Sequence, residues 1–160
     1  MVLLGDSMRK TLFRYAIFGA WMENIRSIEV IDTDDQNIIC TKYENENKKE
    51  VKSTLDKKII EEIKTIIKKH DEIKDIDTIE LAPVLDGTTN SFEICFDGKL
   101  IDISACNIWW FADDKNVENH KKVFGDYPEN ALSILSLHIE IADVLVDNGV
   151  DIYYLKLDNF

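Results

Sequence analysis

Two carboxylates, Glu93 and Asp102, are the residues of this sequence best placed to act together. They flank the pair Asp97-Gly98, which favours a two-residue type I′ turn because both of its central positions need a positive φ. That turn would set Glu93 directly opposite Asp102 in a hairpin over residues 91–105. Like charges in that position repel each other. We therefore expect an offsetting group: a lysine from a neighbouring strand, a metal, a basic partner or a shared proton.

The hairpin lies inside a strongly acidic block. Residues 71–114 hold eleven carboxylates against two lysines, a net charge of −9 in a chain whose formal net charge is −12. An aromatic run over residues 109–111 follows the hairpin, and two aspartates, Asp113 and Asp114, come one residue after it. A concentrated negative field beside large flat aromatic groups favours a basic protein partner. We therefore predict a partner interface made of Glu93, Asp102, Trp109, Trp110, Asp113 and Asp114.

Other interpretations of these residues stay open. In the simplest one, Glu93 and Asp102 are solvated acids beside a lysine, and the two tryptophans lie in the core and under a loop. In another, a small acid/base or metal-dependent enzyme uses the two carboxylates and a histidine. We expect His138 to be a neutral core residue. Because no nucleophile elbow, phosphate loop or HExxH motif occurs, we predict no catalytic residue, metal site or cofactor, and whether the protein is an enzyme stays open.

Composition limits the classes of partner. The 160 residues, 45% of them hydrophobic and only two of them proline, suit one globular domain with its own core. A strongly negative chain repels phosphate backbones and anionic lipid surfaces, so we expect no nucleic-acid or membrane binding. No stretch resembles a membrane span or a signal peptide. The three cysteines (Cys40, Cys95 and Cys106) have no CxxC spacing and predict reduced thiols in a cytoplasmic protein.

The hydrophobic pattern predicts further strands around the hairpin. Residues 9–21 fit both a strand and a helix, and their aromatic content and interior Gly19 favour the strand. The polar run 44–50 predicts an exposed loop. The other expected strands cover residues 26–32, 37–43, 76–81 and 150–157.

Two helices are expected. Apolar residues at helical spacing predict one over residues 54–70, with Ser53 as its N-cap and Asp56 three residues later. Pro128 and Gly149 bracket a second helix over residues 128–147. The polar positions of this second helix form one narrow stripe, so most of its circumference should be covered. Such a helix is either central or part of an interface, and the second case would make the protein a structural subunit of a homodimer.

Two stretches carry a resemblance to known proteins. The first, Gly19-Ala20-Trp21-Met22-Glu23-Asn24, ends the first predicted strand. The second, Asp86-Gly87-Thr88-Thr89-Asn90-Ser91-Phe92-Glu93-Ile94, leads into the Asp97-Gly98 turn. With the lysine-rich helix between them, residues 10–110 resemble a family of small uncharacterised bacterial α+β proteins. The resemblance implies an α+β fold and no particular activity, and the aromatic run and the long apolar helix depart from it.

Together these patterns predict a single α+β domain over residues 1–160. It has a mostly antiparallel, curved sheet with two main helices packed on one face. The helices should cover the face that carries Phe92, Ile94, Ile101 and Ile103. The function we expect is a non-enzymatic acidic binding protein, such as an immunity or inhibitor protein for a basic toxin or nuclease. Such a protein uses charge to steer its partner and aromatic anchors to slow its release.

Overall fold

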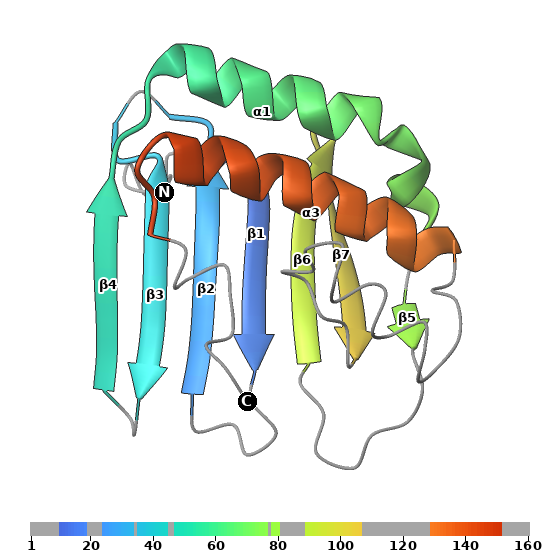
Figure 1. The fold of residues 1–160 in the computed structure, drawn as a ribbon, viewed down its shortest axis with the longest axis horizontal. Helices are drawn as coiled ribbons and strands as arrows, with labels where there is room; N and C mark the ends of the chain where they lie inside the picture. The colour runs from blue at the N-terminus through green and yellow to red at the C-terminus, as the bar shows by residue number, and fades with distance from the viewer. Residues whose placement is uncertain are drawn as a thin grey trace, which may run out of the picture.

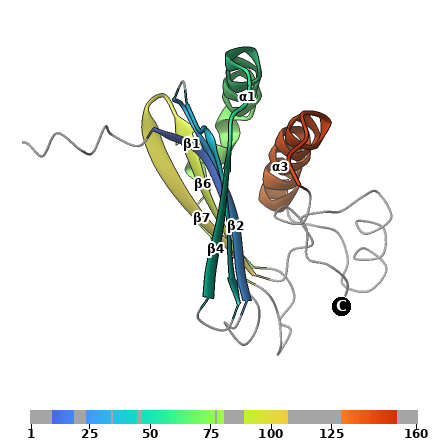
Figure 2. The same cartoon turned by 90° about the vertical axis from the view of Figure 1, so that its left-hand side faces the viewer.

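A sheet with two long helices on one of its faces forms the framework of the protein (Figures 1 and 2). The computed structural model describes residues 10–18, 24–33, 35–44, 47–76, 78–80, 89–106 and 129–151. The elements in chain order are β1 (Thr11–Phe18), β2 (Asn24–Ile31), β3 (Ile38–Glu44), β4 (Asn47–Ser53), α1 (Lys57–Lys69), η1 (Asp71–Asp75), β5 (Thr78–Glu80), β6 (Thr89–Phe96), β7 (Lys99–Cys106) and α3 (Glu129–Asp147). The predicted α+β fold with a mostly antiparallel, curved sheet and two helices is confirmed.

The sheet joins two antiparallel units through its central strand. Its strand order is β4-β3-β2-β1-β6-β7-β5, so β1 pairs with β2 on one side and with β6 on the other. All neighbours are antiparallel except β5, which runs parallel to β7. The predicted strands over residues 26–32, 37–43 and 76–81 correspond to β2, β3 and β5, and residues 9–21 contain a strand rather than a helix.

The β6–β7 hairpin has the predicted turn and register. Asp97 and Gly98 both take a positive φ, 50° and 79°, as a type I′ turn requires. Glu93 therefore pairs with Asp102 across the two strands. The face that carries Phe92, Ile94, Ile101 and Ile103 lies under the helices, with Ile101 only partly buried.

The start of the first helix differs from the prediction. Ser53 is the last residue of β4, and Asp56 is the N-cap of α1, with its carboxylate accepting from the backbone N–H of Lys58 at 3.2 Å. The buried side chain of Asn37 explains the later start. Its Oδ1 accepts from the N–H of Leu55 at 2.6 Å, and its Nδ2 donates to the carbonyl of Leu55 at 3.0 Å. These bonds hold Leu55 outside the helix, because its backbone groups are already paired.

The prediction of a loop over residues 44–50 is wrong. This stretch contains the end of β3 and the first half of β4, whose seven residues are all exposed. A polar, lysine-rich sequence is also typical of an edge strand, where charged side chains discourage pairing with other chains. The lysines Lys48 and Lys52 each lie 3.4 Å from Glu50, which stabilises the strand locally.

The second long helix, α3, agrees with its predicted range. Its buried residues pack against the sheet, and α1 lies beside it in the same layer (Figure 1). None of the described helices is long and apolar enough to cross a membrane. Residues 152–157, most of the last predicted strand, lie outside the described residues, and residues 150–151 are irregular.

Candidate partner-binding face

The sheet face opposite α1 and α3, here called the outer face, carries no helix of the described residues (Figure 2). Arg14 lies on this face because it alternates with Phe13 and Tyr15, which are buried beneath the helices. The strand register places Glu29 and Glu93 on either side of Arg14, and Asp102 beside Glu93. These four residues, here called the charged row, cross four neighbouring strands.

The charged row holds three carboxylates and one guanidinium. Arg14 Nη1 lies 3.5 Å from Glu93 Oε2. Glu29 is only 7% exposed and accepts a hydrogen bond from Thr11 Oγ1 at 2.6 Å. Asp102 is exposed and forms no ion pair with a lysine or arginine of the described residues. Of the offsetting groups that we predicted, the described residues supply a basic side chain from a neighbouring strand, although it is an arginine and not a lysine.

The Glu93 carboxyl is the electrostatically unfavourable member of the row. Partial burial raises its pKa above the ordinary value. Arg14 opposes this shift, while the neighbouring carboxylates of Asp102 and Glu29 add to it. A positive charge brought to this position would stabilise the ionised form of Glu93.

The structure brings together only part of the predicted interface. Glu93 and Asp102 lie side by side on the outer face, with Glu93 half-buried and Asp102 exposed. The other four predicted residues, Trp109, Trp110, Asp113 and Asp114, lie outside the described residues.

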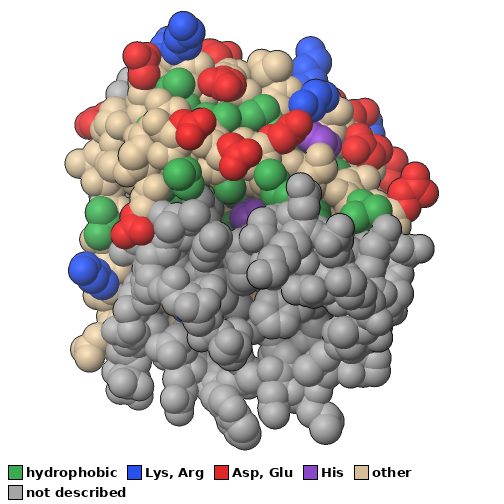
Figure 3. Space-filling model, viewed as in Figure 1, with side chains coloured by type: hydrophobic (Ala, Val, Ile, Leu, Met, Phe, Trp, Pro, Cys, Tyr) green, Lys and Arg blue, Asp and Glu red, His purple; other side chains and the backbone are tan. Residues whose placement is uncertain are grey.

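Carboxylates also occur over the helices (Figure 3). Several of them pair with lysines: Glu61 with Lys64, at 2.9 Å, and Glu140 with Lys69, at 2.6 Å. The acidic character of the chain is thus spread over both sides. The charged row is distinguished by three carboxylates with one cation, Arg14, while the described lysines of the same face, Lys48 and Lys52, lie on β4 beside Glu50.

The two described histidines lie on the helix side of the sheet, away from Glu93 and Asp102. His70 caps α1, and its Nε2 lies 2.8 Å from Glu140 Oε2. His138 is buried in α3 with its ring centroid 4.5 Å from that of Tyr15, and burial lowers its pKa to about 3. The predicted core position of this histidine is confirmed, and its lowered pKa favours the neutral form. Within the described residues, no group of three or more potential ligands could hold a metal ion.

Arg14 and Glu29 were not among the predicted site residues. The alternation of Phe13, Tyr15 and Ile17 already placed Arg14 on the face opposite the apolar residues. The sequence does not indicate that β1 pairs with β6, because the two strands are far apart along the chain.

Comparison with known proteins adds no assignment. No family model matches the chain, and no curated protein matches it. The resemblance to small bacterial α+β proteins therefore stays a prediction.

Replacing Arg14 by glutamine should lower the free energy of unfolding by about 1 kcal/mol at neutral pH, because the row then holds only carboxylates. The pKa of Glu93 would rise further above its ordinary value of 4.5. The loss should therefore vanish below that value and grow as the pH rises through the folded-state pKa. Urea unfolding at pH 7 and at about pH 4 measures the loss of stability and its dependence on pH. Adding Glu93→Gln should restore most of the stability at pH 7, and a loss that is equal at both pH values would contradict this account.

Proposed function

We propose that this protein binds a basic protein partner through its outer face, as an immunity or inhibitor protein for a cationic toxin or nuclease would. The observation that supports this most is the charged row: clustered carboxylates with one described cation, on a sheet face that no described helix covers. The formal net charge of −12 points in the same direction.

A lysine or arginine of the partner would lie against Glu93 and Asp102. It would add a second positive charge, beside that of Arg14, and reduce the mutual repulsion of the two carboxylates. At longer range, the negative field of the protein would speed the encounter with a basic surface, and salt would weaken this effect. Trp109 and Trp110 remain the predicted aromatic anchors, and Asp113 and Asp114 the predicted rim charges.

The test starts by capturing partners from the host on the immobilised protein at low salt. Association rates of a captured partner are then measured by stopped flow for the double variant Glu93→Gln/Asp102→Asn. We expect the rate at low salt to fall roughly fivefold to tenfold and to depend less steeply on salt, because steering is electrostatic.

A matched control separates the local effect from net charge. The double variant Glu62→Gln/Asp143→Asn removes the same number of charges from exposed positions on α1 and α3. It should slow association much less than the outer-face variant. If both variants act equally, or if the captured partners are not basic, the outer face is not the binding site and the proposal fails.

A further inference from the structure

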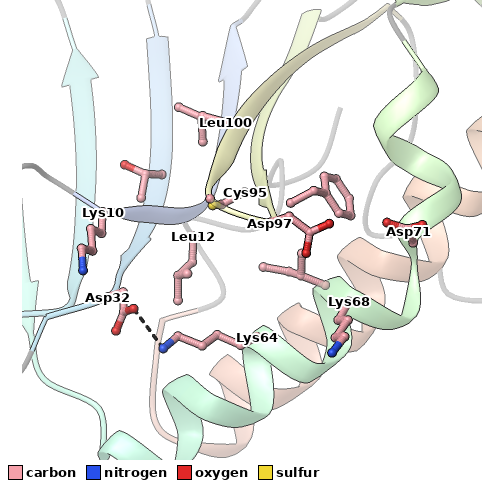
Figure 4. A pocket seen from close by; sticks show the side chains of 13 residues that line it. Lys10, Leu12, Asp32, Lys64, Lys68, Asp71, Cys95, Asp97 and Leu100 are labelled. Atoms are coloured by element: carbon pink, nitrogen blue, oxygen red, sulfur yellow. Dashed lines mark ion pairs between the residues drawn. The ribbon is translucent and has the colours of Figure 1, made fainter.

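A second site lies at the turn end of the β6–β7 hairpin. A cavity of about 610 Å³ opens between α1, the start of β1 and the tip of the hairpin (Figure 4). The cavity exists because β1 and β6 separate at this end, where their pairing stops at Phe13 and Ile94. The pairing of β1 with β2 is also irregular here, between Thr11 and Phe13. The hairpin tip curves away from β1, which leaves space above the helix.

The wall of the cavity is largely apolar. Leu12 of β1 and Leu100 of the hairpin line it (Figure 4), together with Ile67 of α1 and Phe96 of the hairpin. Its volume falls in the range of sites that hold small molecules, about 300–1,000 Å³, and such sites combine apolar walls with a few polar groups.

Two of the lysines that line the cavity form no ion pair with a described residue and could contact a ligand. Asp32 is neutralised by Lys64 at 2.9 Å, and Asp71 by Lys74 at 3.0 Å. The remaining lining cations, Lys10 and Lys68, form no ion pair with any described residue. They reach the cavity from different elements, Lys10 from the chain before β1 and Lys68 from α1 (Figure 4).

One lining carboxylate opposes these lysines. Asp97 occupies the hairpin turn and has no ion pair among the described residues either. Its charge should weaken the binding of an anion and favour that of a cation. The effect of replacing Asp97 on ligand affinity therefore tests whether the ligand is an anion or a cation.

We propose that this cavity binds a small apolar acid. The hydrocarbon part of the ligand lies against Leu12, Ile67 and Phe96, and its carboxylate or sulfonate lies at the rim near Lys68, while Lys10, on the opposite side of the cavity, adds positive charge at longer range (Figure 4). This site is independent of the outer-face proposal, because neither lysine belongs to the charged row.

The probe is 8-anilino-1-naphthalenesulfonate, an apolar anion whose fluorescence rises in apolar surroundings. We expect saturable binding to the folded protein and displacement by decanoate but not by decanol. Lys68→Gln should raise the dissociation constant roughly twofold to fivefold, the effect of one exposed charge contact. Asp97→Asn should lower it, and asparagine suits the type I′ turn, so this variant folds.

Two matched controls distinguish the cavity from other surfaces. Lys58→Gln removes an exposed lysine of α1 that does not line the cavity, and it should leave the dissociation constant unchanged. Leu100→Glu should weaken binding strongly, whereas Leu132→Glu should not, although the two leucines are 45% and 44% exposed. Unchanged thermal unfolding midpoints would exclude binding to a partly unfolded state.

The proposal is overturned by any of three results. The first is no saturable binding to the folded protein. The second is equal effects of Lys68→Gln and Lys58→Gln. The third is weaker binding by Asp97→Asn, which would mean that the cavity prefers a cation.

Discussion

Replacing Phe92 by alanine should lower the free energy of unfolding by about 3–5 kcal/mol, the usual cost of removing a buried phenylalanine ring. Phe92 is fully buried at the centre of an aromatic cluster. Its ring centroid lies 4.9 Å from that of Tyr15, 6.3 Å from that of Phe13 and 5.8 Å from that of His138. The truncation leaves a cavity between the sheet and α3 that rigid neighbouring strands cannot close. Urea denaturation followed by circular dichroism measures the loss.

Leu100→Ala is the comparison for this variant. Leu100 lies on the same hairpin but is 45% exposed, so its truncation should change stability by only about 0.5 kcal/mol. Equal losses for the two variants would mean that α3 does not pack on the face that carries Phe92.

The parts of the fold that depend on local chemistry could be predicted from the sequence. The Asp97-Gly98 pair determines the turn, and the turn determines which residues of β6 and β7 lie opposite each other. Helix α3 could also be predicted, because its apolar residues repeat at helical spacing and a glycine follows its end. That residue, Gly149, has a φ of 86°.

Features that depend on distant residues could not be predicted. The edge strand β4 has the composition of a loop, and only its pairing with β3 makes it a strand. Helix α1 begins after Asp56 because Asn37, far away in the chain, binds the backbone of Leu55. In each case a neighbour in space overrides the local pattern.

The candidate site shows the same division. Glu93 and Asp102 belong to one hairpin, so their proximity could be predicted from its register. Arg14 reaches Glu93 only through the β1–β6 pairing, and that pairing also decides how much charge is left for a partner. The cavity near Lys68 depends on where the same pairing stops, which no local pattern in the sequence indicates.

The stability of the protein should fall steeply in mild acid because of His138. Burial lowers the pKa of this histidine from 6.5 to about 3, so the folded state keeps it neutral while the unfolded chain takes up a proton. Its contribution is fully present above pH 6.5 and is lost as the pH falls toward about 3. The expected slope is about 1.4 kcal/mol per pH unit, or about 2 kcal/mol between pH 6.5 and pH 5.

This window separates the histidine from Glu140, and Glu93, whose pKa is raised, acts with the opposite sign because its protonation favours the folded state. Glu140 contributes with the same sign, but at lower pH. Partial burial works against ionisation, yet the hydrogen bonds from Lys69 and His70 hold the pKa of Glu140 below its ordinary 4.5. Its stabilisation is therefore complete above that value and is lost only as the pH falls further. Measurements between pH 7.5 and pH 5 are thus made above the range in which Glu140 becomes protonated.

His138→Gln should flatten the dependence of unfolding free energy on pH in this window, whatever it does to stability at neutral pH. His70→Gln removes the other described histidine and should keep the slope, because His138 is intact in it. Urea unfolding of both variants at several pH values provides the comparison. If His138→Gln retains the slope of the parent protein, the folded state admits a proton at His138, and α3 cannot be sealed against Tyr15 and Phe92 as the ring distances indicate.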